Sequence, residues 1–432
     1  MNIENNFIQS NLFEMKKNKQ ICLIIFLCVF ICSCKQLSTI NSNENSYISI
    51  REFNVLPENS PQTNKKNLQE AINWASERGA ALFVDPSEEP YPMDGGIILK
   101  ENVSLIGVHG PTPRGTINPN KKGTPVGSVF KITDKENVFI TVESATQIKG
   151  IQFWYPEQTI KDPLKIIPYP ATIQTSKTSS TQGVYLSCLT FYGEYLAMDF
   201  NCDPQYICEL MTFEHCYGYP LRGEFIRIDY CYDIPRLLHC HVNPAVQRFI
   251  GGQYSPAVVD AVIANKTFAY SINHTDNAQM IDIFTFGTYG GIFLGGDTYG
   301  QLTNFNLDCV AVGIYKKGNN TFNRNWQIAQ GSIIANTGEQ IENIHPIIIE
   351  GEGHTSFTNV ESFSGLNPAL TTVDEKQSWD YMIIKGDKKT TVSLFGCRMR
   401  NYVSDQPFTI HNKKATLHVN GCFDKNEALI SY

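Results

Sequence analysis

The chain has 432 residues, of which 42% are apolar and 18% are charged, and its formal net charge is −7. This composition supplies a large apolar core and excludes a chain that is disordered along its whole length. The weakly negative charge lacks the basic excess typical of nucleic-acid-binding proteins, so we expect no nucleic-acid partner.

The first 34 residues have the pattern of an export signal. Three lysines precede an apolar run from Ile21 to Ile31, which is too short to cross a bilayer. The run ends in the letters ICSC, which resemble the cleavage box of bacterial lipoproteins and predict lipidation of Cys34. An ordinary signal peptide or a membrane anchor is the alternative. We therefore expect an exported protein, lipid-anchored to the bacterial outer membrane on its periplasmic or cell-surface side.

A polar stretch over residues 35–47 predicts a flexible tether, and residues 48–432 are expected to form a single domain. The domain begins with a segment that alternates like a strand, YISIREFNVL. A helix is predicted next, with one apolar face made of Leu68, Ala71, Ile72 and Ala75. Gly79 suits the left-handed residue that commonly ends such a helix. Three short strands are expected within residues 81–110.

Short segments with alternating apolar and polar residues then recur to the C-terminus. They lie at 148–153, 186–191, 208–213, 279–284, 301–307, 354–360, 391–397 and 415–422. The dipeptide Tyr-Gly begins at residues 192, 217, 289 and 299, and its first two copies are 25 residues apart. We interpret this spacing as one coil of a solenoid, and the next interval as three further coils. The chain after residue 102 has room for about 12 coils.

The order of strand, helix with the core AINWA, LFVDP and NVSLIG resembles the N-terminal segment of pectate-lyase-superfamily proteins. The segments FWYPEQ, PYPATI and IDYCYDIPRLLHCHVNP are similar to those of bacterial secreted proteins related to glycoside hydrolase family 28. The resemblance implies an all-β, right-handed parallel β-helix with an N-terminal capping helix, and a carbohydrate-active function. A β-sandwich or propeller fits the long, irregular connections less well.

Two long segments interrupt the coils, at 154–181 and 241–277. Segments of this length without a coil of their own are usually functional or mobile. The first contains Trp154, Tyr155 and Tyr169, whose rings are predicted to stack on sugar rings. The alternative is that these rings cover a flank of the solenoid.

Between the two interruptions, strand alternation in FIRIDY directs Ile226 and Ile228 inward and Arg227 and Asp229 outward. Such a pair is either a surface ion pair or part of a polarised site beneath the two loops. Arg227 is therefore a predicted substrate-binding residue. The other predicted polar contacts to substrate are Arg222, His239, His241 and Asn243.

Glycoside hydrolysis requires two carboxyl groups on either side of the scissile bond. The predicted catalytic candidates are Glu157, Asp229, Asp233 and Asp276, and Glu157 with Asp229 is the preferred pair. The expected function is hydrolysis of a polysaccharide or oligosaccharide. One alternative is a lyase acting on uronic-acid chains, which needs a base together with cations such as Ca²⁺, Arg or Lys. Another is a non-catalytic surface protein that binds glycans.

Nine cysteines, from Cys188 to Cys422, follow the signal segment, and none of them forms a CxxC motif. We therefore expect buried free thiols and no structural metal site, and the sequence leaves any disulfide pairing open. No cofactor is expected other than Ca²⁺ in the case of a lyase. The protein is expected to be a monomer.

Overall fold

A computed structural model describes residues 47–112, 123–319, 325–335, 344–363, 378–400 and 402–431, apart from the side chain of Phe249. The unit Tyr47–Tyr432 is described on its own. The signal segment, most of the tether and Cys34 lie outside the described residues. Within the described ranges, no helix combines the length and the apolar character needed to cross a membrane.

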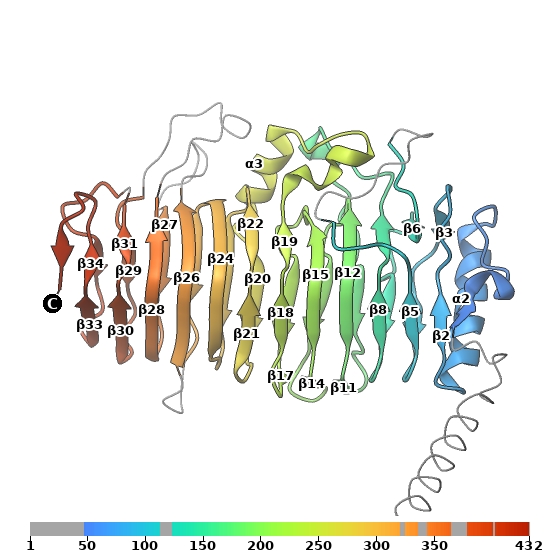
Figure 1. Ribbon diagram of the computed structural model, residues 1–432, viewed down its shortest axis with the longest axis horizontal. Coiled ribbons are helices and arrows are strands. Elements are labelled where there is room, and N and C mark those ends of the chain that lie inside the picture. Colours follow the sequence, from blue (N-terminus) through green and yellow to red (C-terminus); the bar gives the residue numbers. More distant parts are fainter. Residues whose placement is uncertain are drawn as a thin grey trace, which may run out of the picture. The chain divides into compact units, whose positions relative to one another are not determined.

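The described chain winds into coils whose strands stack in parallel, in sequence order from blue to red (Figure 1). An 11-stranded sheet, here called sheet B, takes one strand from each of 11 successive coils. Its strands are β4 (Ile97–Leu99), β7 (Ile140–Val142), β10 (Ile173–Thr175), β13 (Met198–Asn201), β16 (Ile226–Asp229), β20 (Phe268–Asn273), β23 (Gly290–Gly295), β25 (Val312–Lys316), β27 (His345–Ile349), β29 (Met382–Ile384) and β32 (Phe408–Ile410). The architecture is the predicted right-handed parallel β-helix.

A 21-stranded sheet, sheet A, forms the other walls together with a three-stranded sheet C. Sheet A contains β1 (Tyr47–Ser49), β2 (Ala81–Phe83), β3 (Tyr91–Met93), β5 (Ser104–Ile106), β6 (Val129–Ile132), β8 (Gln147–Lys149), β9 (Gln152–Trp154), β12 (Tyr185–Tyr192), β15 (Thr212–Gly218), β18 (Arg236–Leu238), β19 (His241–Val242), β21 (Ala278–Ile281), β22 (Phe284–Phe286), β24 (Gly300–Val310), β26 (Asn325–Ala335), β28 (Gly353–Ser362), β30 (Thr390–Phe395), β31 (Arg398–Met399), β33 (Ala415–Asn420), β34 (Cys422–Phe423) and β35 (Leu429–Ile430). Sheet C contains β11 (Thr181–Gln182), β14 (Cys208–Glu209) and β17 (Cys231–Tyr232).

Each coil from β8 onward bends once within sheet A at a residue in the left-handed region. The bend residues are Gly150, Cys188, His215, His239, Asp282, Asn304, Gln330, Asn359, Gly396 and Gly421. The segment 148–153, expected to be one strand, is therefore two strands with Gly150 at φ 68° between them. The bend breaks the period of two, so Ile148 and Ile151 are both buried although they are three residues apart.

The predicted capping helix is confirmed as α2 (Pro61–Ser76), which packs at the β2 end of the stack (Figure 1). Ser60 caps it through a hydrogen bond accepted from the Thr63 N–H, at 3.2 Å. Its predicted apolar face is fully buried. The strand expected at the start of the domain is shorter than predicted, because β1 ends at Ser49 and the 3₁₀ helix η1 (Ile50–Phe53) follows.

The Tyr-Gly spacing does not follow the coil register. Tyr217 pairs with Thr190 of the preceding coil, so Tyr192 and Tyr217 do not occupy equivalent positions. Tyr217 pairs with His241 of the next coil, and His241 pairs with Phe284 of the coil after that. The interval from Tyr217 to the third Tyr-Gly dipeptide therefore spans two coils rather than the expected three. A long insertion between β19 and β20 accounts for the extra residues.

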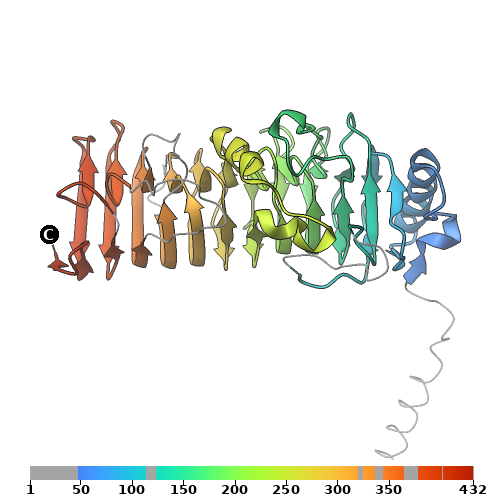
Figure 2. The same ribbon diagram turned by 90° about the horizontal axis from the view of Figure 1, so that it is seen from above.

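Two insertions lie where the chain passes from sheet A to sheet B. The first, residues 155–172, contains η2 (Pro163–Lys165), and the second, residues 243–267, contains η3 (Pro244–Ile250) and α3 (Pro256–Ala264). Because both precede strands of a parallel sheet, both lie at the edge where sheet B strands begin, here the starting edge. They also contact each other (Figure 2): Ser255 Oγ donates to the Lys161 carbonyl at 2.8 Å.

Replacing Ser255 with alanine is expected to lower the free energy of unfolding by about 1 kcal/mol. The Ser255 side chain caps α3 by accepting from the Val258 N–H, and it also joins the two insertions. Chemical denaturation measures the loss. Ser255→Thr is the matched control because threonine keeps both hydrogen bonds, and an equal loss in that variant contradicts the capping role.

Candidate functional site

The outer face of sheet B carries one row of side chains in register across the coils. In this row Asp199 pairs with Arg227, Arg227 with Ser271, Ser271 with Phe293, Phe293 with Tyr315, Tyr315 with Ile348 and Ile348 with Ile383. The row is charged on β13 and β16, aromatic on β23 and β25, and aliphatic on β27 and β29. The predicted inward positions of Ile226 and Ile228 are confirmed, since both are fully buried.

A cavity of about 370 Å³ opens on this face over the aromatic part of the row. It is lined by Lys266, Phe268, Tyr289, Val312, Tyr315, His345, Ile348, Ile383 and Lys385, and we call it the sheet B pocket. Lys266 is the penultimate residue of the second insertion, which precedes β20, whereas Lys385 follows β29 directly. Two cations therefore belong to the pocket, and no described lining residue is a carboxylate.

The rings of the pocket support one another. Phe268 meets Tyr289 edge to face with centroids 5.9 Å apart, and Phe293 meets Tyr315 at 5.5 Å. Phe268 also packs on Phe293 at 5.5 Å. A Cβ at Gly290 would lie 2.1 Å from the Phe268 ring, so glycine is required there for the ring to keep its place. The cluster offers a pre-positioned aromatic surface.

Lys385 and Tyr315 share a carboxylate partner at the wall of the pocket. The Tyr315 hydroxyl donates a short hydrogen bond to Glu350 Oε2, and Lys385 Nζ lies 3.7 Å from the same oxygen. Lys385 Nζ also lies 5.1 Å from the centroid of the Tyr315 ring. Burial, reinforced by the hydrogen bond to Glu350, raises the pKa of Tyr315. The phenol is therefore neutral near pH 7.

A histidine–carboxylate pair completes the pocket. His345 Nδ1 lies 2.8 Å from Asp380 Oδ1, with side-chain exposures of 9% and 0%. Asp380 Oδ2 has no hydrogen-bond partner among the described residues. Since Nδ1 is engaged by Asp380, Nε2 is the ring nitrogen that remains for the pocket.

The four predicted carboxylates are divided between the two edges of sheet B. Asp229 ends β16, at the edge where sheet B strands end, and its carboxylate lies 2.7 Å from His274 Nδ1. Asp233 is exposed, and Asp276 accepts a hydrogen bond from the Ile234 N–H at 3.4 Å, both in turns at this ending edge. Glu157 lies in the first insertion, at the starting edge. Glu157 and Asp229, the preferred pair, therefore lie at opposite edges of sheet B.

Glu157 has a different partner, since its carboxylate lies 2.6 Å from Lys135 Nζ and both side chains are about half exposed. An exposed pair of this kind contributes little to stability. The contact joins Glu157 of the first insertion to the connection between β6 and β7 in the preceding coil. Among the described residues, no second carboxylate contacts Glu157 to form the pair that its predicted catalytic role requires.

Two of the three rings of the predicted aromatic platform are buried rather than exposed. Tyr155 and Tyr169 are only 3% and 1% exposed, with ring centroids 4.6 Å apart. The Tyr155 hydroxyl is hydrogen bonded to Thr172 at 2.8 Å. Both rings pack down onto the coil, so neither offers a face to a ligand. Trp154 is half-buried and lines a separate cavity of about 350 Å³ on sheet A, beside three prolines.

The predicted arginines lie near sheet B but are already paired. Arg227 holds Asp199 through two hydrogen bonds, at 2.8 and 3.2 Å. Arg222 lies 2.8 Å from Glu224 at the starting edge. Asn243 has a structural contact, because its side chain accepts from the Ala245 N–H and caps η3.

The predicted histidines project from sheet A instead. His239 is hydrogen bonded to Asp282 at 2.9 Å and stacks on His215 at 4.7 Å. His241 stacks on Phe284 with centroids 4.1 Å apart. Neither residue joins Arg227 or Asp229 on the outer face of sheet B.

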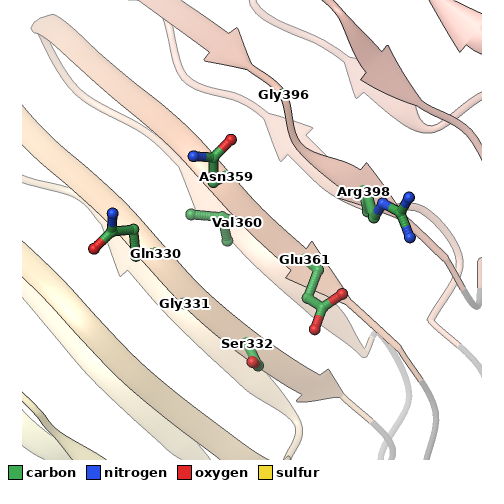
Figure 3. A pocket seen from close by; sticks show the side chains of 8 residues that line it. All are labelled: Gln330, Gly331, Ser332, Asn359, Val360, Glu361, Gly396 and Arg398. Atoms are coloured by element: carbon green, nitrogen blue, oxygen red, sulfur yellow. The ribbon is translucent and has the colours of Figure 1, made fainter.

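A third concavity, of about 380 Å³, follows the bend of sheet A. Its lining is Gln330, Gly331, Ser332, Asn359, Val360, Glu361, Gly396 and Arg398. Figure 3 shows the lining residues on neighbouring strands, with the polar side chains of Gln330, Ser332, Asn359, Glu361 and Arg398 among them. None of its described lining residues is aromatic or a histidine, so it lacks the rings and the base of the sheet B pocket.

The described residues contain no group of three or more His, Cys, Asp or Glu side chains arranged to hold a metal ion. All nine cysteines of the described chain are free thiols, as expected from the sequence. Eight of them are buried, and Cys188 is half-buried.

No sequence pattern pointed to the pocket residues His345, Lys266, Lys385 and Tyr315, or to Asp380 behind His345. They come from coils that are far apart in the sequence, so no local motif joins them. A signal was available in the sheet B strands, whose outward positions change from charged to aromatic between Asp199 and Tyr315. Reading that signal requires the coil register, which the second insertion shifts.

No protein-family model matches the chain, and no curated protein matches its sequence. Similar solved structures include the tailspike of Acinetobacter phage vB_ApiP_P1, at 9% identity and a TM-score of 0.42, over 90% of this chain. The chain spans 56% of the length of that tailspike.

Another similar structure is the A-module of the Azotobacter vinelandii mannuronan C-5 epimerase AlgE6, at 11% identity and a TM-score of 0.44, covering 87% of this chain and 99% of that one. The Yersinia enterocolitica family 28 exopolygalacturonase has 12% identity and a TM-score of 0.40, covering 87% of this chain and 77% of that one. At these values, none of the three carries an argument about substrate or reaction.

Proposed function

We propose that this protein is carbohydrate-active and binds an acidic glycan in the sheet B pocket. The observation that carries the proposal is the lining, which combines Phe268, Tyr289 and Tyr315 with two lysines. Aromatic faces stack on the C–H faces of sugar rings, and ammonium groups pair with carboxylates or sulfates. The net charge of −7 disfavours a polyanion globally, but the local charge of a site governs binding within it.

Two reactions are candidates. Hydrolysis of O-glycosyl bonds, the reaction expected from the sequence, would use paired carboxylates, and Asp229, Asp233 and Asp276 at the ending edge are its candidates. Elimination is favoured by a specific observation, because the described lining of the pocket contains a histidine and two lysines but no carboxylate. A protein that binds without cleaving is the third candidate.

A polysaccharide panel tests the proposal. De-esterified polygalacturonate and alginate are compared with fully methyl-esterified polygalacturonate, which keeps the chain but removes its charge. Calorimetric titration is expected to give tighter binding of the two charged polymers. New reducing ends without absorbance near 235 nm indicate hydrolysis, and a rise in that absorbance indicates elimination. Equal or tighter binding of the ester, or no binding at all, contradicts the proposal.

We also propose that the protein is exported and anchored through a lipid on Cys34, as its ICSC sequence suggests. Replacing Cys34 with alanine is then expected to abolish incorporation of radiolabelled palmitate and to prevent signal cleavage at this position. Cys32→Ala is the matched control, because it changes a cysteine two residues earlier and leaves the lipidated one. Equal labelling of the Cys34 variant and the wild type excludes this anchor.

A further inference from the structure

The His345–Asp380 pair differs from the other histidine–carboxylate pairs of the described chain. His239–Asp282 and His274–Asp229 have side chains that are 20% to 54% exposed, and neither pair lines the sheet B pocket. In the third pair Asp380 is fully buried, whereas His345 lines the pocket. Charge interactions are stronger where water is excluded, so this pair orients its imidazole most firmly.

The burial of Asp380 is costly for the fold. One of its oxygens contacts His345, and the other has no hydrogen-bond partner among the described residues. A buried carboxylate with incomplete hydrogen bonding destabilises a protein relative to an apolar residue of similar size. Packing alone therefore does not account for a carboxylate here. Its contact fixes the tautomer and the direction of the imidazole beside a cavity.

We propose that His345 is the general base in an eliminative cleavage of a uronate chain bound in the sheet B pocket, with Asp380 as its positioning residue. This inference rests on the proposed function. The lysines supply the second requirement of such a reaction, which is a positive charge beside the uronate carboxylate. Among the described residues Lys266 has no ion-pair partner within 4 Å, so its ammonium is available to a ligand.

The reaction balances without a further reactant. His345 Nε2 takes the proton from the carbon that bears the carboxylate, C5, and the C–H electrons form the C4–C5 double bond. The bond from C4 to the bridging oxygen breaks, and that oxygen leaves with the bonding electrons. The imidazolium returns its proton to the leaving oxygen, directly or through water. One product has a new reducing end, and the other has an unsaturated sugar that absorbs near 235 nm.

The lining favours this reaction over hydrolysis inside the pocket. Asp380 lies behind His345 and is fully buried, so it does not reach a bound sugar. The Glu350 carboxylate is engaged by the Tyr315 hydroxyl and lies beside Lys385. Neither acid is therefore placed to protonate a leaving oxygen, as a hydrolase requires.

The test uses polygalacturonate and alginate as substrates for the full chain, with absorbance at 235 nm as the rate and calorimetric titration as the affinity. His345→Asn is expected to lower kcat by at least about 100-fold with Kd within threefold of the wild type. Imidazole is expected to restore part of the rate of His345→Gly. Asp380→Asn is expected to lower kcat at unchanged Kd, which a residue with only a structural role would not do. His354→Asn, a hydrogen-bonded histidine on sheet A, is the matched control.

The outcomes separate the inference from the function on which it rests. Suppose that acidic glycans bind but the products are saturated, no product forms, or His345→Asn keeps full activity. Each of these results overturns the inference and leaves the proposed function standing. If neither polygalacturonate nor alginate binds, both the inference and the proposed function are overturned. If His345→Asn does not fold, the imidazole rescue of His345→Gly and the kcat of Asp380→Asn decide the question.

Discussion

Replacing Glu194 with glutamine is expected to raise the midpoint of thermal unfolding at pH 8 and to change it little at pH 4. Glu194 follows β12 and is fully buried, and neither carboxyl oxygen has a well-formed hydrogen bond among the described residues. Burial raises its pKa to about 8, and the nearby backbone N–H groups of Glu194 and Tyr219 offset only part of this effect. The folded protein therefore holds this carboxyl neutral at pH 7.

The sign of the pH dependence follows from the two pKa values. Below pH 4.5, the ordinary pKa of a glutamate side chain, the carboxyl is neutral in both the folded and the unfolded chain. Between that pH and about 8 only the unfolded chain ionises, so the folded state loses about 1.4 kcal/mol per pH unit. Stability is thus lost as the pH rises, by roughly 3 to 5 kcal/mol in total.

Glutamine is neutral at every pH, so Glu194→Gln removes this slope. Thermal unfolding followed from pH 4 to pH 8.5 measures it. Glu70→Gln is the matched control, since Glu70 is exposed on α2 and pairs with Lys66. Parallel pH profiles for the wild type and Glu194→Gln would contradict the buried neutral carboxyl.

The fold was predictable because its signals are local. Ser60 and Pro61 are typical of a helix start, and the apolar face from Leu68 to Ala75 needs only the period of a helix. Strand alternation likewise placed Ile226 and Ile228 in the core. The Ser255-Pro256 start of α3 carries the same helix signal as Ser60-Pro61.

The site was not predictable, because closeness along a coil is not closeness in space. Each coil turns through several faces, so Asp229 and His241 are 12 residues apart but project from different sheets. Neighbours on one face are instead a coil apart, as Phe293 and Tyr315 are. The set from Arg222 to Asn243, chosen because its members are near in sequence, was therefore distributed over sheet B, its two edges and sheet A.

Aromatic content was an equally poor guide to exposure. The proline-rich segment around Tyr155 and Tyr169 was expected to hold its rings out to a ligand, yet both rings are buried. A tyrosine can stack on a ligand or pack in a core. In a core its hydroxyl also needs a hydrogen-bond partner, which Tyr155 has in Thr172. The packing of an insertion onto its coil decides between the two, and no residue pattern within the insertion reports it.

Replacing Lys385 with methionine is expected to weaken binding of de-esterified polygalacturonate or alginate by about 10- to 100-fold, because a hydrogen bond to a charged group contributes about 1.5–3 kcal/mol. Methionine keeps a long apolar side chain and removes the ammonium. Binding of the fully methyl-esterified polymer is expected to stay within threefold of the wild-type value. Calorimetric titration at low and high salt measures both, and Lys66→Met on the exposed face of α2 is the matched control.

The Lys385 variant removes one charge but affects two interactions, because the ammonium also lies 3.7 Å from Glu350 Oε2. Its loss removes an attraction to the ligand and leaves Glu350 to repel the same ligand. The double variant Lys385→Met/Glu350→Gln separates the two effects, since only the lost attraction persists in it. If the double variant regains wild-type affinity, Lys385 serves to neutralise Glu350 rather than to bind the glycan. Equal losses for the charged polymer and its ester would instead show that Lys385 maintains the shape of the pocket through Tyr315.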